Sequence, residues 1–482
     1  MSAYEGKKVT FNFITENSSS TEATTFLPIW INPLLYQASA IRNPNIVLIS
    51  IDTLRPDHLG IYGYNRNTSP HIDSLARDGV LFRNALSTTS WTLPAHVSML
   101  TALYSAHHKV YYPLELFSHS IPTLAESLRS HYYSAAFTGG AYLSAKFGFS
   151  KGFDTYEEFK RSTETSLQKD EAALMFQKAS QWLEGNKNKK FFLFLHTYQT
   201  HSPYGSAAPF GTQFLSRHDK WQEFSPEDTF GNSFTTRVTD EEKANIVNLY
   251  DGDIRYTDEA LVKELIKKLK ALDLYDSTLI ILTSDHGEEF YEHGAWLHGH
   301  DLYNEVTRIP LIMKFPGSAY KNAQIIPTVR IIDIMPSILE YFDIDYTAFN
   351  LDGRDFLSVI RGTVTTNRET ISDLALKNEL NVCPAIISVN HNNLKLIITK
   401  KIDPLSPHQP EDLNRYKLEL YDIIKDPGEK FNLAYRPWYS NTIKMLIATA
   451  DTYSKNIQNQ QTQEIQLDEE LKERLKALGY IK

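Results

Sequence analysis

Carboxylate, imidazole and hydroxyl side chains occupy positions in this sequence where strands are predicted to end or a helix to begin. Asp52 follows one run of apolar residues, and Asp285 and His286 follow another. Thr92 lies two residues before Pro94, and Pro is favoured in the first turn of a helix, where free amides and the helix dipole attract anions. Taken alone, Thr92 also fits a simple helix cap. Side chains of these types bind metal ions, transfer protons and attack esters.

Three apolar runs predict the strands that position these groups. Large and often β-branched side chains follow one another without polar alternation, a pattern typical of central strands in a parallel sheet. The runs are residues 46–51, 191–195 and 278–283. Ligands of open parallel sheets bind beyond the carboxyl ends of the strands. We therefore expect Asp52, Asp285 and His286 to lie on one rim of the sheet.

The segments between and after these runs indicate the class of fold. Leucines at helical spacing predict an amphipathic helix over residues 261–272, with Thr257 as its cap. A helix followed by a strand is typical of an α/β crossover. In the tail, residues 385–389 and 394–399 predict a β-hairpin, and residues 418–421 predict a further strand.

These elements predict an α/β fold with a large central, mostly parallel sheet sandwiched by helices, and a smaller C-terminal antiparallel sheet. The length of 482 residues favours one large domain with an appendage, or two domains. We expect an N-terminal extension over residues 1–42, the main catalytic α/β domain over 43–365, and a C-terminal α+β subdomain over 366–482.

The composition excludes several kinds of partner. The chain has 49 Lys and Arg against 58 Asp and Glu, a net charge of −9, which argues against nucleic acid as a main partner. No run approaches the roughly 18 apolar residues of a membrane span. The start lacks the layout of a secretory signal, so we expect a cytoplasmic protein, or a periplasmic or secreted one where the N-terminus has been processed. The sequence leaves the oligomeric state open.

The cysteine content limits the kinds of metal site that this chain can form. The single cysteine, Cys383, cannot form an intrachain disulfide and excludes sites built from several thiolates. Any bound metal must therefore be held by Asp, Glu, His or hydroxyl ligands.

Four motifs, in order along the chain, resemble the sulfatase branch of the alkaline phosphatase superfamily. Asn45 to Gly63, through Asp52, resembles its opening strand, and Thr92-Leu93-Pro94-Ala95-His96 falls where that family has Cys-x-Pro-Ser-Arg. Residues 284–288, Ser-Asp-His-Gly-Glu, match the second metal motif, and residues 420–433 match the C-terminal signature. The resemblance extends from about Asn45 to the C-terminus and implies the fold of that superfamily and cleavage of esters.

Departures from the family's pattern suggest which ester is cleaved. Sulfatases that act on sulfate esters resemble each other in a Cys or Ser that is oxidised to formylglycine, and Thr92 cannot form that aldehyde. Thr53, His96 and Ala102 replace the family's second Asp, its Arg and its motif Gly, and residues 138–140 lack its substrate-binding Lys and His. The chain in this respect resembles phosphonate monoester hydrolases and Thr-dependent phosphoethanolamine or glycerophosphate transferases.

That resemblance implies that Asp52, Thr92, Asp285 and His286 hold one divalent metal ion. Two carboxylates, an imidazole and a hydroxyl suit Zn²⁺ or Mn²⁺ better than Ca²⁺, which prefers more ligands, all of them oxygen. A metal-bound hydroxyl ionises far more readily than a free one, so Thr92 is expected to attack a small anionic ester and form a covalent phospho-threonine. No formylglycine is expected.

Two histidines are expected to act as acid and base. His201 lies beyond a predicted strand end, and His298 lies twelve residues after His286 (298 − 286 = 12). Both positions resemble substrate-anion histidines of the Thr-dependent transferases, which implies proton transfer. Taken alone, each histidine also fits a structural position.

Other polar residues near the motifs are expected to support the reacting groups. His196 and the neighbours Glu288 and Glu289 are expected to lie around the ligands without binding metal. Arg55 fits both an anion contact and an ion pair with the acids of the rim.

The favoured function is metal-dependent hydrolysis of phosphate or phosphonate esters through Thr92. Three alternatives stay open: a sulfuric ester hydrolase, a transferase that passes the phospho-group to an alcohol acceptor, and a non-catalytic binding protein on the same scaffold.

Overall fold

A computed structural model describes residues 44–159, 170–206, 209–215, 235–375, 385–400, 416–455 and 463–478. The predicted extension and Cys383 lie outside these residues. Every helix in the described part of the chain is too short or too polar to cross a membrane.

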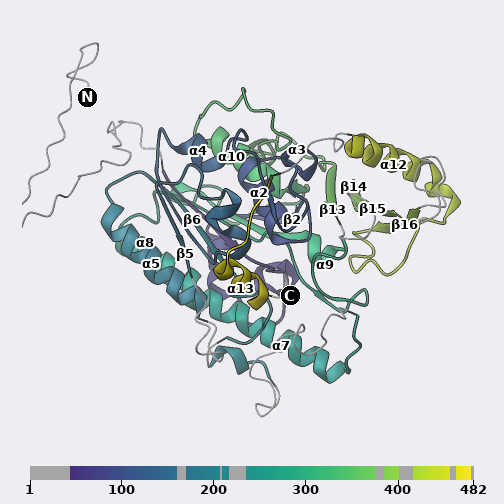
Figure 1. The fold of residues 1–482 in the computed structure, drawn as a ribbon, viewed down its shortest axis with the longest axis horizontal. Helices are drawn as coiled ribbons and strands as arrows, with labels where there is room; N and C mark the ends of the chain where they lie inside the picture. Colours follow the sequence, from purple (N-terminus) through teal and green to yellow (C-terminus); the bar gives the residue numbers. More distant parts are fainter. Residues whose placement is uncertain are drawn as a thin grey trace, which may run out of the picture. The chain divides into compact units, whose positions relative to one another are not determined.

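A large sheet of nine strands dominates the described residues (Figure 1). Its order is β11-β2-β10-β7-β1-β6-β4-β5, with β12 also paired to β2. The five strands from β7 to β5 are mutually parallel, whereas β10 runs antiparallel to both of its neighbours. The strands are β1 Asn45–Ile51, β2 Val80–Leu86, β4 Tyr133–Thr138, β5 Thr155–Glu158, β6 Phe191–Thr197, β7 Thr278–Thr283, β10 Arg308–Lys314, β11 Ala323–Ile325 and β12 Val329–Arg330. The prediction of a mostly parallel central sheet is confirmed.

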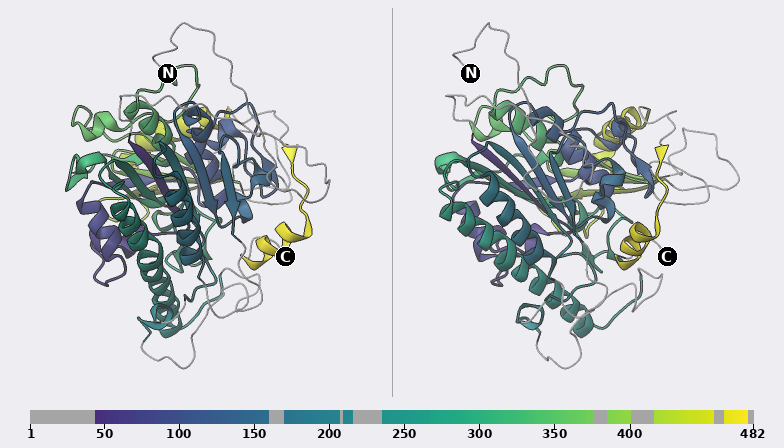
Figure 2. Two further views of the ribbon diagram at one scale, coloured as in Figure 1. Left: turned by 90° about the vertical axis from the view of Figure 1, so that its left-hand side faces the viewer. Right: turned by 60° about the vertical axis from the view of Figure 1, so that its left-hand side comes forward.

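Helices cover both faces of this sheet, as Figures 1 and 2 show. Alternate side chains of β1 enter two separate cores: Ile46 and Leu48 pack with α2 and α10, and Val47 and Ile49 pack with α1, α5, α7 and α8. Burial on both faces explains why β1 is apolar without a break over residues 46–49. The helices are α1 Pro70–Arg77, α2 Thr92–Thr101, α3 Ser105–His108, α4 Leu124–Leu128, α5 Glu171–Asn186, α7 Asp240–Thr257, α8 Glu264–Ala271, α9 Asn304–Thr307, α10 Ile334–Tyr341, α11 Leu357–Ile360, α12 Ser440–Lys455 and α13 Glu469–Ala477.

The helix before β7 begins earlier than its leucine pattern indicates. α7 continues through a π-helical segment, Asp258–Lys263, directly into α8. Thr257 therefore lies inside the helix, where its hydroxyl donates to the Asp253 carbonyl, and its prediction as a cap is wrong. The cap is Thr239, whose hydroxyl accepts from the Glu242 amide in a capping box. Because the first turns of α7 are polar, the spacing of apolar residues does not indicate where this helix begins.

Replacing Thr239 with Ala is expected to lower the free energy of unfolding by about 1 kcal/mol, because it leaves the first-turn amide without its side-chain acceptor. Denaturant titration of Thr239→Ala against the wild type measures this difference. Thr239→Ser, which keeps the hydroxyl, serves as the control and should stay near the wild type. Equal midpoints for all three proteins would contradict the assigned cap.

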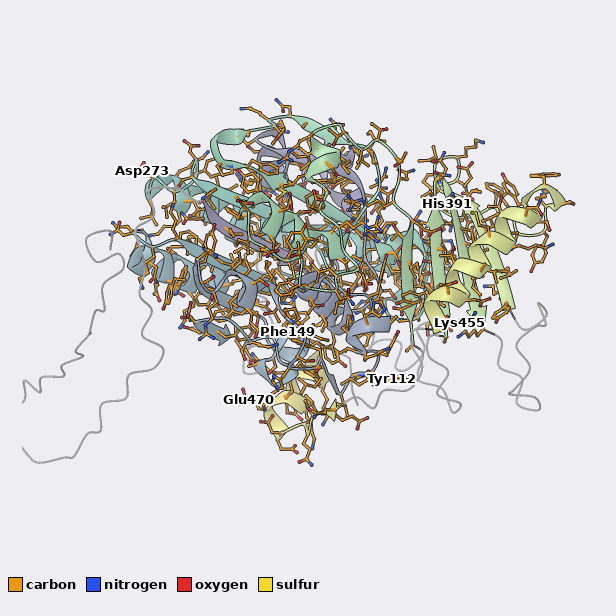
Figure 3. All side chains as sticks on the ribbon, turned by 90° about the horizontal axis from the view of Figure 1, so that it is seen from above. Tyr112, Phe149, Asp273, His391, Lys455 and Glu470 are labelled. Atoms are coloured by element: carbon orange, nitrogen blue, oxygen red, sulfur yellow. The ribbon has the colours of Figure 1, made fainter. Side chains whose placement is uncertain are left out.

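A second, antiparallel sheet follows in the order β13-β14-β15-β16 (Figure 3). Its strands are β13 Thr370–Leu374, β14 Ile386–His391, β15 Leu394–Lys400 and β16 Tyr416–Asp422. The predicted hairpin is β14 and β15, in which His391 pairs with Leu394 next to the turn. Side chains of α12 pack on β14 and β15. The smaller sheet is therefore confirmed, whereas the exact division at residue 366 stays a prediction.

Two pairs of very short strands complete the described sheets. They are β3 Glu115–Leu116 with β17 Gln463–Glu464, and β8 Glu289–Phe290 with β9 Trp296–Leu297.

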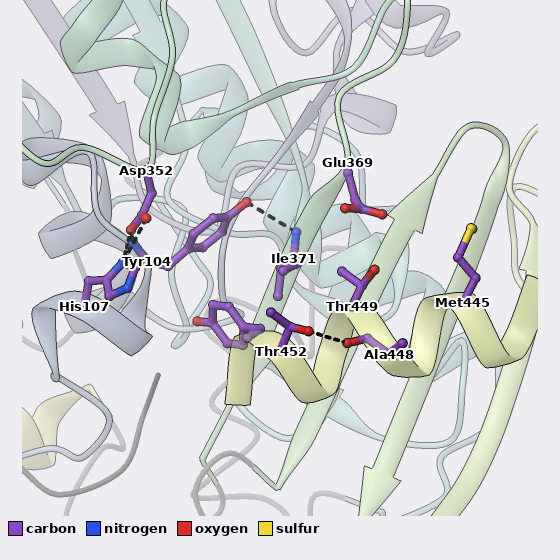
Figure 4. Close-up of a pocket in the computed structure, with 10 residues that line it drawn as sticks. Tyr104, His107, Asp352, Glu369, Ile371, Met445, Ala448, Thr449 and Thr452 are labelled. Atoms are coloured by element: carbon purple, nitrogen blue, oxygen red, sulfur yellow. Dashed lines mark hydrogen bonds and ion pairs between the residues drawn. The ribbon is translucent and has the colours of Figure 1, made fainter. Parts of the chain in front are cut away.

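A crevice of about 550 Å³ opens where α3 and β13 meet α12 (Figure 4). His107 contacts Asp352 across its wall at 2.7 Å, and Tyr104 accepts a hydrogen bond from the Ile371 amide at 3.4 Å. None of the residues that carry the predicted chemistry lines this crevice. It lies beside the edge strand β13 of the smaller sheet and outside the candidate site.

Candidate active site

The register of three parallel strands places the two candidate acids beside each other. β1 pairs in parallel with β7, with Ser50 opposite Thr283, and with β6, with Ser50 opposite His196. Asp52 and Asp285 follow the ends of β1 and β7. Both carboxylates therefore reach the same edge of the sheet, and both are fully buried.

Thr92 joins these acids from the first residue of α2. Its Oγ1 lies 3.3 Å from Asp52 Oδ2, to which it donates, and 3.3 Å from His286 Nε2. Trp91 occupies the N-cap position without a side-chain cap, so Thr92 is not the cap that its position before Pro94 allowed. Thr92 is fully buried and its hydroxyl faces the acids of the rim.

His286 presents one ring nitrogen to this cluster. Its Nδ1 contacts the Gly287 carbonyl at 2.8 Å, and since a carbonyl only accepts hydrogen bonds, the neutral ring carries its proton there. Nε2 then carries the lone pair, at 3.3 Å from Asp285 Oδ2 and 3.8 Å from Asp52 Oδ1. This is the tautomer that a metal-binding histidine requires.

The cluster has the properties of a cation site. One ligand atom from each of Asp52, Asp285 and His286 lies within 4.8 Å of the other two. Asp52 Oδ1 and Asp285 Oδ2 are buried and have no hydrogen-bond partner in the described part of the chain. Burial raises the pKa of Asp52 to about 7, although His286 opposes the rise, and burial together with Asp52 raises the pKa of Asp285. Two buried carboxylates, each with one oxygen that lacks a hydrogen-bond donor, fit a bound cation that would offset their charge.

His201 and His298 lie next to this cluster. The ring of His298 is 4.4 Å from that of His286 and 5.0 Å from that of His201, centroid to centroid. His201 Nδ1 contacts the Ser202 carbonyl at 2.6 Å. The structure thus brings together all six residues singled out from the sequence, namely Asp52, Thr92, His201, Asp285, His286 and His298.

His298 differs from His201 in the group behind it. His298 Nδ1 lies 2.7 Å from Glu288 Oε1, and the other oxygen of that carboxylate accepts from the Tyr204 hydroxyl at 2.7 Å. Burial raises the pKa of Glu288 to about 7 and lowers the pKa of His298 to about 3. The sequence gives no signal for Tyr204 as a site residue, because its contact with Glu288 depends on how two distant loops meet.

Two further histidines contact the residues proposed as ligands or the strand that carries them. His196 Nε2 lies 3.3 Å from Asp52 Oδ2, as its position next to β1 implies. His96, one turn after Thr92, contacts the Thr92 carbonyl at 2.9 Å and the Ser50 hydroxyl at 3.0 Å. Burial lowers the pKa of His96 to about 3 and that of His196 to about 4. Both rings are therefore neutral packing groups around the carboxylates.

A strained turn follows Asp52. Thr53 has a φ of 55°, in the left-handed region that β-branched residues rarely occupy. Its hydroxyl donates to the Thr200 carbonyl at 2.9 Å, and the Thr200 hydroxyl donates back to the Asp52 carbonyl. The Tyr250 hydroxyl donates to the Thr53 carbonyl at 2.7 Å. These bonds hold the segment that carries Asp52 against the segment that leads to His201.

The contacts of Arg55 are those of a structural ion pair and not of an anion-binding residue. Its guanidinium bonds Asp57 and Glu292, each at 2.7 Å, and the Glu288 carbonyl at 2.8 Å. Its partners are therefore acids of the neighbouring loops, and the rim carboxylates Asp52 and Asp285 are not among them.

Two other groups bring histidine and acids together. They are Glu289, His300 and Asp301, and Glu289, His293 and Glu305. Each histidine is ion-paired there, His300 with Glu289 at 2.8 Å and His293 with Glu305. Burial opposes the charge, but hydrogen bonds to Asp301 and Glu289 raise the pKa of His300 to about 10. Both groups are thus satisfied as ion pairs.

Comparison with known proteins assigns the family. The family model described as Sulfatase matches residues 44–344, and the model described as N-sulphoglucosamine sulphohydrolase, C-terminal, matches residues 291–458. The first match covers more than half of the chain. The chain therefore belongs to the sulfatase family.

Curated relatives span most of the chain at low identity. Human N-sulphoglucosamine sulphohydrolase is 23% identical over 444 residues, covering 80% of this chain and 85% of the relative. A multifunctional alkaline phosphatase superfamily protein of Trinickia caryophylli is 26% identical over 491 residues, covering 83% of this chain and 93% of the relative.

Solved structures share the fold. The phosphonate monoester hydrolase of Agrobacterium radiobacter superposes with a TM-score of 0.69 at 19% identity, covering 86% of this chain and 96% of that one. The phosphonate monoester hydrolase of Silicibacter pomeroyi gives a TM-score of 0.70 at 18% identity, covering 87% of this chain and 99% of that one. The family match confirms the resemblance to the sulfatase branch, and these neighbours confirm the fold that it implies.

Proposed function

We propose that this protein is a metal-dependent hydrolase of small phosphate and phosphonate esters, with Thr92 as the nucleophile. One observation carries the proposal: the Thr92 hydroxyl lies 3.3 Å from both Asp52 Oδ2 and His286 Nε2, within a cluster suited to a cation. Membership of a family of ester-cleaving hydrolases supports the reaction class. The residue type at position 92 favours phosphorus over sulfate esters, since no formylglycine can form from threonine.

Asp52, Thr92, Asp285 and His286 would hold the metal ion, and a mixed set of carboxylate, hydroxyl and imidazole ligands favours Zn²⁺ or Mn²⁺ over Ca²⁺. A divalent cation there would supply positive charge that offsets the two buried carboxylates and promotes ionisation of the hydroxyl. Side chains of this protein carry out the nucleophilic attack and the proton transfers. Thr92 Oγ1 attacks phosphorus and passes its proton toward Asp52 Oδ2, its hydrogen-bond acceptor. His298 packs against His286, His201 packs against His298, and the two serve the bound anion and the leaving group.

Water then attacks the phospho-threonine and returns Thr92 to its free form. A phosphate ester of threonine is a stable bond, so this second step also needs a base. A histidine that gives up a proton in the first step can accept one from water in the second, which closes the cycle.

Sulfate ester hydrolysis is the second candidate, and the family match is the observation that favours it. The two candidates differ in the ester that the same site turns over. A panel of esters that share one leaving group separates them.

We expect phosphate-type esters to exceed sulfate esters in kcat/KM. The measurement is a panel of p-nitrophenyl sulfate, phosphate, phosphodiester and phosphonate, assayed with metal-stripped and metal-restored protein. Because all four esters release p-nitrophenol, differences in rate report the group that is attacked. A preference for the sulfate ester would overturn the proposal in favour of the second candidate. Bound metal without turnover of any ester would instead support a binding protein on this scaffold.

A further inference from the structure

Glu288 makes contacts that the proposed reaction has not yet used. Its carboxylate is fully buried, and each of its oxygens contacts a side chain from a different segment, His298 Nδ1 at Oε1 and the Tyr204 hydroxyl at Oε2. Its main-chain carbonyl accepts from Arg55 Nη1 at 2.8 Å. The residue is therefore held at both its side chain and its backbone.

The contact with Nδ1 determines which nitrogen of His298 can serve the substrate. The two nitrogens of an imidazole lie on different edges of the ring, so a ring held at Nδ1 by Glu288 turns Nε2 away from that carboxylate. The side chain of His298 is only 5% exposed, and its ring packs against those of His286 and His201. A buried ring of this kind has one functional orientation, and Glu288 selects it.

The comparison with His201 shows that the carboxylate has a specific effect. His201 and His286 both have a main-chain carbonyl at Nδ1, which orients the ring without adding charge. His298 has a carboxylate there instead. Glu288 contacts His298 Nδ1 with one oxygen and accepts from the Tyr204 hydroxyl with the other, so it ties the ring to a distant segment of the chain. The carbonyls at His201 and His286 belong to the next residue along the chain and provide no such link.

We propose that Glu288, anchored by Tyr204, is a positioning residue that makes His298 the proton donor to the leaving group. This inference rests on the proposed function. In the first step the bond between phosphorus and the leaving oxygen breaks, and that oxygen takes the bonding pair and the proton of His298 Nε2. Thr92 Oγ1 forms the new bond to phosphorus and gives its proton to Asp52. In the second step water attacks phosphorus and gives a proton to His298 Nε2, and Thr92 takes back its bonding pair and its proton.

The test compares leaving groups. A proton donor matters little when the leaving oxygen is stable as an anion and matters greatly when it is not. For Glu288→Gln we expect kcat/KM to fall less than about 10-fold with p-nitrophenyl esters and about 10²- to 10⁴-fold with unsubstituted phenyl esters. Tyr204→Phe keeps the carboxylate and removes its anchor, so a smaller change in the same direction is expected. Metal content and thermal unfolding show whether each variant has kept its site and fold.

Glu289→Gln is the matched control. Glu289 is the adjacent residue, also a fully buried carboxylate paired with a histidine, His300 at 2.8 Å. Its replacement is expected to leave the dependence on the leaving group as in the wild type, whatever it does to stability. An equal loss across all leaving groups in both Glu288→Gln and Tyr204→Phe would overturn the inference.

The two proposals fail in different ways. Rapid quench of the wild type and mass analysis of the peptide that contains Thr92 tests the nucleophile, and the ester panel tests the substrate class. A labelled Thr92 with an unchanged leaving-group dependence in Glu288→Gln rejects only the role of Glu288. An unlabelled Thr92 in a protein that accumulates its intermediate rejects the proposed mechanism itself.

Discussion

Replacing Thr92 with Ala is expected to lower kcat/KM by about 10⁴- to 10⁶-fold, the range seen when a residue of a covalent catalytic unit is removed. The change deletes the nucleophile and, at the same atom, one proposed metal ligand. The decisive measurement is mass spectrometry after a rapid quench: a phosphate or phosphonate mass should appear on the Thr92 peptide of the wild type and be absent from Thr92→Ala.

Two variants separate the loss of the nucleophile from general damage. Thr92→Ser keeps a hydroxyl at the same position and should retain both turnover and the covalent adduct. His201→Ala should keep the metal and lose about 10²- to 10⁴-fold, the usual value of acid or base assistance. Full activity of Thr92→Ala would contradict the covalent mechanism and leave direct attack by water as the explanation.

Removal of the metal is expected to abolish activity completely. Zn²⁺ or Mn²⁺ should restore it better than Ca²⁺, because one ligand is an imidazole. His286→Ala should lower the metal content at equilibrium, since Nε2 is the nitrogen that faces both carboxylates. Elemental analysis of dialysed protein, followed by assays with each ion added back, measures both effects.

Asp373→Asn provides the control for this experiment. Asp373 is also a buried carboxylate, but it belongs to β13 and accepts from the Tyr453 hydroxyl at 2.8 Å. Its replacement should leave one metal ion per chain. Restoration by Ca²⁺ alone, or an unchanged metal content in His286→Ala, would contradict the proposed ligand set.

Much of the fold could be predicted because its central strands are buried on both faces. That burial requires continuous apolar runs such as residues 46–49 of β1, which stand out in any sequence. The rim followed from the same runs, since parallel strands bring their carboxyl ends to one edge. The hairpin of β14 and β15 was predictable for a related reason, as its polar turn separates two apolar strands.

The parts that escaped prediction depend on contacts between distant segments. α7 begins on a polar face, so apolar spacing placed its start too late. The contacts of Glu288 with His298 and Tyr204 join three segments of the chain. No periodic pattern in the sequence predicts such contacts. Arg55 could be assigned only once its acidic neighbours Asp57 and Glu292 were placed.

The turn at Thr53 combines an unfavourable backbone conformation with a hydrogen bond that holds the candidate site together. A β-branched residue with a positive φ costs on the order of 1–3 kcal/mol relative to a relaxed backbone. Glycine would remove that cost, yet it would also remove the hydroxyl that ties the turn to Thr200. Glycine would therefore stabilise the turn beside Asp52 only where the strain it removes exceeds the value of that hydrogen bond.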